Sequence, residues 1–158
     1  MLYGLAATVA GCASGPRPAT VPDEADYGWT YRTSYGIGDP ERPIAIYGPP
    51  ESAALLILEC DPAARLLHLL MIDVDPFEGM RPIVISAHGA VWLGQQRLEQ
   101  PDGSTIARAS IPLGHAVLDS VAAARTPIVI EAGGGRSALR ADPVAARVVR
   151  ECRAAAPG

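Results

Sequence analysis

The sequence predicts a mainly β (α+β) domain: an antiparallel β-sandwich or partly open barrel of about nine strands, with two short helices. Three observations support this fold class. Short apolar or alternating runs recur along the chain, turn residues such as Gly-Pro-Pro and Asp-Gly separate them, and only two stretches have the apolar spacing of a helix. This pattern is typical of an antiparallel sheet and not of repeated strand–helix units.

The predicted strands are short runs bounded by Gly, Pro, Asp and Ser. They cover residues 27–34, 43–47, 54–59, 66–72, 82–87, 90–98, 105–111, 127–131 and 137–140. The run at 54–59 is almost continuously apolar, so we expect it to be buried on both faces. The glycines at 133–135 are predicted to close a hairpin between the last two strands.

Helical spacing occurs at about 115–124 and again after Asp142. Asp142 is a favourable N-cap and Pro143 suits the first helical position, so the second helix should begin there. Its apolar stripe recurs every fourth residue, at Val144, Val148 and Cys152. We therefore expect this helix to pack on the sheet with Cys152 facing the core.

The N-terminus has the features of an export signal. Residues 2–11 are uncharged and mostly apolar, yet too few to span a bilayer. Val9-Ala10-Gly11-Cys12 resembles the lipobox of bacterial lipoproteins, which implies that Cys12 is acylated. The chain departs from ordinary signals in having no Lys or Arg before Cys12. The alternative is a frayed apolar terminus with an incidental cysteine.

Three segments follow from this interpretation. Residues 1–12 would be the signal segment ending at the acylated cysteine, 13–26 a flexible proline-bearing tether, and 27–158 a single globular β-rich domain. Ala13 stands where an Asp would favour inner-membrane retention in Gram-negative lipoproteins. By that resemblance the protein is expected on the outer membrane, facing the periplasm.

The cysteine count then leaves Cys60 and Cys152 after Cys12 is assigned to lipid. We expect these two to form a disulfide in an oxidising compartment, closing a loop of roughly 90 residues. The alternative is two buried free thiols. Both interpretations make the two residues structural.

Composition limits the partners. The net charge is -4 and only 5% of residues are aromatic, so nucleic acid is not an expected partner. The acidic loop with Asp73, Asp75 and Glu78 lacks the calcium-loop pattern Asp-x-Asp-x-Asp-Gly, so we expect no metal and no cofactor. The expected partners are a membrane, through the lipid anchor, and an envelope protein.

An enzyme interpretation rests on Ser86 and His88, two residues apart at the end of a predicted strand. No Gly-x-Ser-x-Gly elbow is present, and a solvated turn histidine is the better explanation of His88. His68 is expected to be a satisfied or half-exposed core residue. We therefore expect no catalytic residues, with Ser86 and His88 as the weak alternative.

The candidate binding face is aromatic. Tyr27, Trp29 and Tyr31 alternate, so they share one face of a strand. That face is expected to belong to the core. If it were exposed, it would form a patch suited to protein or glycan contact.

Three motifs resemble an uncharacterised group of small alphaproteobacterial envelope proteins over residues 27–153: Tyr47-Gly48-Pro49-Pro50-Glu51-Ser52, the run from Leu55 to Cys60, and Ala146-Arg147-Val148-Val149-Arg150-Glu151-Cys152-Arg153. The domain is also distantly similar to periplasmic modules of the invasion-associated locus B and type VI secretion accessory types. The resemblance implies a non-catalytic binding or accessory module. The alternatives are a small envelope hydrolase using Ser86 and His88, or an inhibitor-type lipoprotein that binds a cell-wall enzyme. The Ser-Gly-x-x-Tyr loop of the lipoprotein lysozyme inhibitors is absent.

Overall fold

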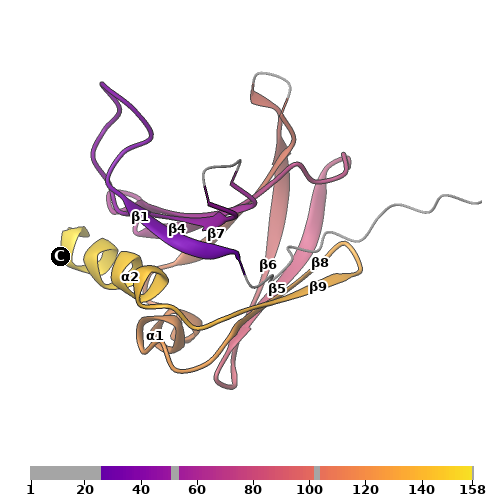
Figure 1. Ribbon diagram of the computed structural model, residues 1–158. Helices are drawn as coiled ribbons and strands as arrows, with labels where there is room; N and C mark the ends of the chain where they lie inside the picture. The colour runs from indigo at the N-terminus through magenta and orange to yellow at the C-terminus, as the bar shows by residue number, and fades with distance from the viewer. Residues whose placement is uncertain (1–25, 51–53, 102–103, 158) are drawn as a thin grey trace, which may run out of the picture.

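A computed structural model describes residues 26–50, 54–101 and 104–157. It contains one curled half-barrel sheet of nine antiparallel strands and two helices, as the sequence predicted (Figure 1). Cys12 and the tether before Asp26 lie outside the described residues, so the expectations for lipidation and the tether stay predictions.

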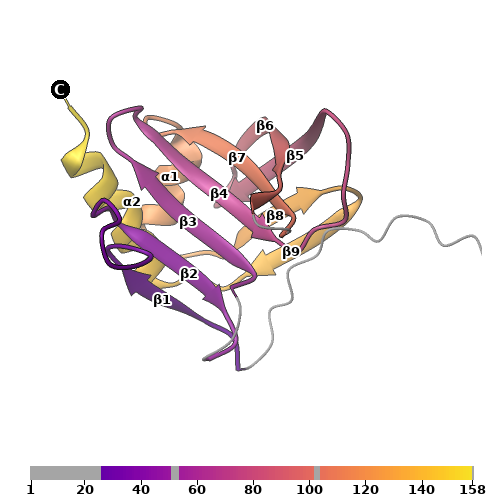
Figure 2. The same ribbon diagram turned by 90° about the horizontal axis from the view of Figure 1, so that it is seen from above.

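The nine strands follow the predicted runs closely. Across the sheet they are ordered β1 (Gly28–Arg32), β2 (Ile44–Gly48), β3 (Leu56–Asp61), β4 (Leu66–Ile72), β7 (Ile106–Pro112), β6 (Ala90–Glu99), β5 (Met80–Ala87), β8 (Ile128–Ala132) and β9 (Gly135–Leu139). The first four strands form a meander, labelled in order from the lower left of Figure 2. The two edges of the sheet are β1 and β9.

The pairing of β4 with β7 joins the two halves of the chain into a single sheet. It runs antiparallel from Leu66 opposite Pro112 to Ile72 opposite Ile106. The chain therefore passes from β4 to β5 and returns through β6 and β7. Because all strands belong to one sheet, the partly open barrel is the correct alternative and the sandwich is not formed.

Strand β5 begins at Met80, two residues before the predicted start at Pro82. Proline cannot donate a backbone hydrogen bond, so it is poorly tolerated inside a sheet. Here β5 pairs with β8 only from Ile83 to Ser86, so Pro82 lies beyond that ladder. The strand can therefore continue through the proline, along β6.

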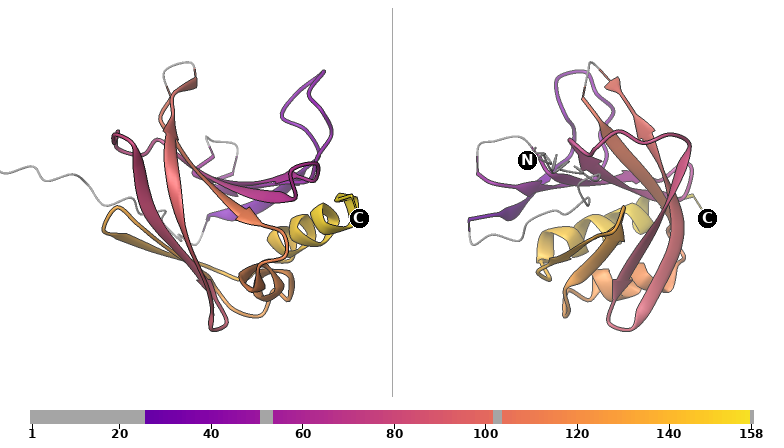
Figure 3. Two further views of the ribbon diagram at one scale, coloured as in Figure 1. Left: turned by 180° about the vertical axis from the view of Figure 1, so that it is seen from behind. Right: turned by 90° about the vertical axis from the view of Figure 1, so that its right-hand side faces the viewer.

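Both helices lie in the curl of the sheet, as the view from behind also shows (Figure 3). Helix α1 (Ala116–Ala122) contacts β5 and β6, α2 (Pro143–Ala155) contacts β1, β2 and β3, and the helices contact each other. Asp142 caps α2 as predicted, because its Oδ1 accepts a 2.7 Å hydrogen bond from the backbone N–H of Val144. The buried face of α2 consists of Ala145, Ala146, Val148, Val149 and Cys152.

A disulfide fastens α2 to the sheet. Cys60 in β3 is bonded to Cys152 with an S–S distance of 2.02 Å, and both residues are completely buried. The predicted pairing is therefore present. It holds the C-terminal helix against the first half of the sheet.

The predicted two-sided burial of β3 is also confirmed. Leu56 and Leu58 join the main core under the helices, whereas Ile57 packs with Ile44 and Leu70 in a second cluster on the opposite, outer face. The outer face of β2, β3 and β4 is thus partly apolar and carries the polar groups described below.

Candidate functional site

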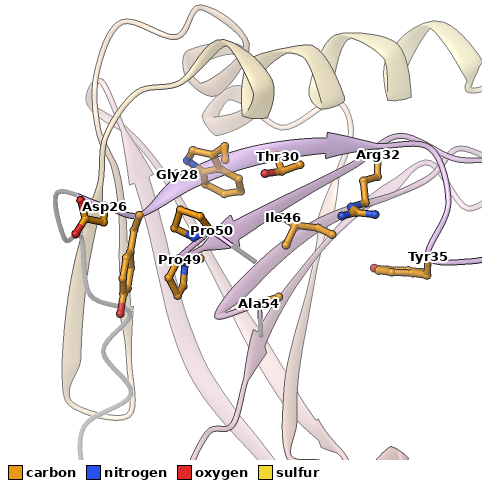
Figure 4. A pocket seen from close by; sticks show the side chains of 12 residues that line it. Asp26, Gly28, Thr30, Arg32, Tyr35, Ile46, Pro49, Pro50 and Ala54 are labelled. Carbon is orange, nitrogen blue, oxygen red and sulfur yellow. The ribbon is translucent and has the colours of Figure 1, made fainter. Parts of the chain in front are cut away.

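A hollow of about 580 Å³ lies over β1 and β2 and the turn that follows them. Figure 4 shows Asp26 at one end of it and Arg32 and Tyr35 toward the other, with Pro49 and Pro50 between them. Its lining mixes aromatic, proline, glycine and charged residues: Asp26, Tyr27, Gly28, Trp29, Thr30, Arg32, Tyr35, Ile46, Gly48, Pro49, Pro50 and Ala54. This composition suits contact with another molecule, because it offers apolar surface framed by opposite charges.

Strand geometry explains why the hollow forms here. Gly28, Thr30 and Arg32 alternate along β1 and are exposed, while the residues between them are half-buried. Gly28 pairs with Gly48, so neither strand contributes a side chain at that point. A Cβ added to Gly28 would meet nothing within 4 Å, which shows how open the surface is.

The candidate aromatic face is half-buried and turned toward the core. The ring centroids of Tyr27 and Trp29 lie 6.2 and 5.2 Å from that of Tyr47, which is itself buried. The three aromatics Tyr27, Trp29 and Tyr31 all pack against the main core. The structure therefore places this face as core, the first of the two alternatives, although Tyr27 and Trp29 also reach the hollow.

Tyr31 links β1 to α2. Its hydroxyl donates a hydrogen bond to Glu151, and the guanidinium of Arg147 lies 3.7 Å from the centre of its ring. Partial burial and the Glu151 carboxylate raise the pKa of Tyr31. The hydrogen bonds from Tyr31 and Arg147 lower the pKa of Glu151, so this carboxylate stays ionised.

Beside the hollow, a buried carboxylate organises a polar cluster that sequence reasoning missed. Glu59 is only 5% exposed and pairs with Arg42 at 3.0 Å. It also accepts a 2.8 Å hydrogen bond from the Tyr35 hydroxyl. Desolvation and this carboxylate raise the pKa of Tyr35 well above its ordinary value. Since Tyr35 lines the hollow, the cluster fixes one wall of it.

Next to Glu59, a serine, a histidine and an aspartate lie in a row across β7, β4 and β3. His68 Nδ1 is 2.9 Å from Ser110 Oγ, and His68 Nε2 is 3.8 Å from Asp61 Oδ2. Burial and the nearby Arg108 lower the pKa of His68, which favours its neutral ring. A neutral imidazole can accept a proton from a hydroxyl, which is the first step of serine-based hydrolysis.

Sheet geometry accounts equally for this row. Ser110 is the direct cross-strand neighbour of His68 in the β4–β7 pairing, and Glu59 is its neighbour in the β3–β4 pairing. Cross-strand neighbours on one face satisfy each other's polar groups without any catalytic role. Of the two expectations for His68, a satisfied or a half-exposed core residue, the structure agrees with the first, because its side chain is buried and contacts Ser110.

The weak catalytic pair is not assembled into such a row. Ser86 lies in β5 opposite Val91 and Val129, and His88 is exposed in the following turn with a φ of 47°. In the part of the chain that the structure describes, neither side chain forms a hydrogen bond or an ion pair with an acid. Ser86 therefore belongs to the strand and His88 to the turn that follows it.

Two further findings concern ligands and membranes. Residues 26–50, 54–101 and 104–157 contain no group of three or more His, Cys, Asp or Glu side chains that could hold a metal ion. Within the same ranges, neither helix has the length and apolar character needed to cross a bilayer.

Comparisons with known proteins add no relative: no family model, no curated protein and no solved structure matches this chain.

Proposed function

We propose that this chain is an exported lipoprotein, anchored in the outer membrane through acylated Cys12 and facing the periplasm. Its folded domain acts there as a non-catalytic binding or accessory module of the cell envelope. The hollow over β1 and β2 is its binding site for an envelope partner.

The disulfide supports the proposed location in the periplasm, an oxidising compartment. A bond between Cys60 and Cys152 persists in oxidising environments and is rare in the reducing cytosol. The apolar segment ending at Val9-Ala10-Gly11-Cys12 supplies the matching export and lipidation signal. Both features are expected of a domain that folds outside the cytoplasm.

The binding role rests on the hollow. It combines half-buried rings, two prolines and the opposite charges of Asp26 and Arg32 in one exposed region. Aromatic and arginine side chains contribute strongly to protein interfaces, and aromatic rings bury much area at little entropic cost. This surface is therefore the single observation that carries the binding proposal.

The rival function is a small envelope hydrolase, which the row of Ser110, His68 and Asp61 favours over Ser86 and His88. Two observations count against the rival. The aspartate is 3.8 Å from the ring, longer than a hydrogen bond, and the lining of the hollow includes none of these three residues. The test is complementation of a strain that lacks this protein. If a folded Ser110→Ala variant fails to restore the phenotype that the wild-type chain restores, the hydrolase becomes the better proposal.

The compartment is tested by the intact mass of the protein extracted from membranes of a Gram-negative host. A chain that starts at Cys12, carries acyl mass and exposes two thiols only after reduction would agree with the proposal. A chain that retains its first residues and has three alkylatable thiols without reduction would contradict it.

The binding site is tested by a photo-crosslinking amino acid placed at Thr30, within the hollow, in living cells. The matched control is the same amino acid at Ala138, an exposed position on the opposite edge strand β9. Adducts at position 30 with a mass other than twice that of the chain support an envelope partner. Equal adducts at both positions, or none at 30, contradict the assignment of the hollow.

A further inference from the structure

The two edges of the sheet differ in how they are protected. Edge strands normally carry charges or prolines that discourage pairing with another chain. In β9, Arg136 is exposed and paired with Glu131 of β8 at 3.4 Å. Strand β1 also carries one charge, Arg32, but at its last residue, and residues 27–31 before it contain neither a charge nor a proline. The described chain places no strand beyond β1, so β1 is an edge open to pairing.

The sequence of this edge is nearly symmetric about its centre. Reading outward from Trp29, a small residue, then a tyrosine, then a charged residue follow on each side, and the two end charges are opposite. The segment is Asp26-Tyr27-Gly28-Trp29-Thr30-Tyr31-Arg32. A segment of this kind is complementary to itself when it runs antiparallel to a second copy.

We propose that two copies of this chain associate through antiparallel pairing of β1 with β1, with Trp29 on the two-fold axis. In this register Asp26 lies opposite Arg32 of the second copy, and the symmetric pair forms at the other end. Tyr27 lies opposite Tyr31, and Gly28 opposite Thr30. A closed two-fold contact is the commonest arrangement of soluble homo-oligomers.

The side chains of β1, and of Asp26 and Tyr27 immediately before it, agree with this register. Asp26 and Arg32 are exposed, line the same hollow, and form no ion pair with other described residues. On the inner face, Tyr27, Trp29 and Tyr31 are only half-buried within one copy. Directly opposed aromatic pairs and opposite charges both stabilise antiparallel strands. Pairing would also satisfy the outward backbone groups of the edge.

This inference goes beyond the proposed function. An envelope partner can bind the hollow of a monomer, so failure of self-pairing leaves the binding proposal intact. Conversely, a pure homodimer without heterologous adducts at Thr30 would contradict only the binding proposal.

The register is tested with cysteines in two differently tagged full-length copies expressed together. Gly28→Cys in one copy and Thr30→Cys in the other lie directly opposite in the proposed register. The new Cβ at position 28 is sterically free. Gly28→Cys with Arg32→Cys is the control for a shifted register, because these positions are not opposite each other in the proposed pairing. Arg136→Cys with Ala138→Cys is the control for pairing through the other edge strand, β9.

A mixed disulfide in the first pair at about ten times the level of both controls is expected, because cysteines with Cα atoms beyond about 7 Å cannot bridge. Equal yields in all three pairs, or adducts only with other proteins, overturn the proposal.

The charges are tested by a swap. Asp26→Arg and Arg32→Asp each place two like-charged pairs across the two-fold, whereas the double variant restores two opposite-charged pairs in reversed order. Light scattering of the full chain in detergent should give a dimer dissociation constant raised about tenfold in each single variant. The double variant should return to near the wild-type value, which also shows that the substitutions leave the fold intact. A monomer at all concentrations, or single variants that dimerise like the wild type, overturns the proposal.

Discussion

The indole of Trp92 lies directly across Gly94 on the inner face of β6. A Cβ added to Gly94 would be 2.0 Å from Cη2 of Trp92, closer than real atoms approach. Trp92 is only 8% exposed and belongs to the main core, so its ring has little room to move. Glycine at position 94 is therefore required by the tryptophan two residues before it.

Gly94→Ala is expected to destabilise the domain by at least about 1 to 3 kcal/mol, because the methyl group overpacks the core. Chemical denaturation followed by Trp fluorescence would measure the loss. Gly114→Ala is the matched control, since a Cβ at Gly114 would meet nothing within 4 Å. Equal losses in the two variants would disprove the packing argument.

Removing the disulfide should lower the free energy of unfolding by about 2 to 5 kcal/mol, since the bond closes a loop between residues 92 apart. The change is Cys60→Ala with Cys152→Ala, and the measurement is thermal unfolding with and without reductant. Reductant should lower the melting temperature of the wild type and leave that of the double variant unchanged. A wild type insensitive to reductant under unfolding conditions would contradict this role.

The lowered pKa of His68 predicts that the folded domain loses stability in mild acid. Its folded-state pKa is lowered by burial and Arg108, despite the opposing effects of Glu59 and Asp61. The unfolded chain therefore binds a proton more readily than the folded one. The contribution of neutral His68 to the free energy of unfolding is therefore fully present above about pH 6.5 and is lost as the pH falls through the folded-state pKa.

Unfolding titrations between pH 7.5 and 5 should thus show a steeper fall for the wild type than for His68→Asn, which keeps a polar side chain beside Ser110. His88 and His115 are common to both proteins and cancel. Parallel curves would show that His68 does not experience the proposed desolvation.

Loss of the N-cap of α2 should cost about 1 kcal/mol, because Asp142 satisfies the backbone N–H of Val144. Asp142→Ala is the test by equilibrium denaturation. Asp142→Asn should stay near the wild-type stability, since asparagine caps helices about equally well. If both variants lose the same amount, the negative charge and not the cap is the relevant property.

Local features of the fold could be predicted from the sequence because they depend on neighbouring residues. The Asp142-Pro143 start of α2 needs only capping chemistry, and the turn at 133–135 needs residues that accept a positive φ. Gly133 and Gly134 indeed have φ values of 56° and 81°. The pairing of Cys60 with Cys152 followed from the helical stripe and the count of cysteines.

The polar clusters could not be predicted, since they depend on which strands are neighbours. Ser110 meets His68 only because β7 pairs with β4, and the β4–β7 pairing skips two intervening strands. Ser86 and His88, by contrast, are close in sequence, but one lies in β5 and the other in the turn that follows it. The hollow, too, requires the register that puts Gly28 opposite Gly48.

The bond between β3 and the last helix also has a consequence for biogenesis. If the chain is exported as proposed, with its N-terminus first, Cys60 would cross the membrane long before Cys152, which lies in the last described helix. Until α2 arrives, the inner faces of β2 and β3, with Tyr47, Leu56 and Leu58, have no helix to cover them. In that interval the earlier thiol of Cys12 would be the competing partner for Cys60. Acylation of Cys12 would remove that competitor, so lipid attachment before oxidation would direct the chain to its native cross-link.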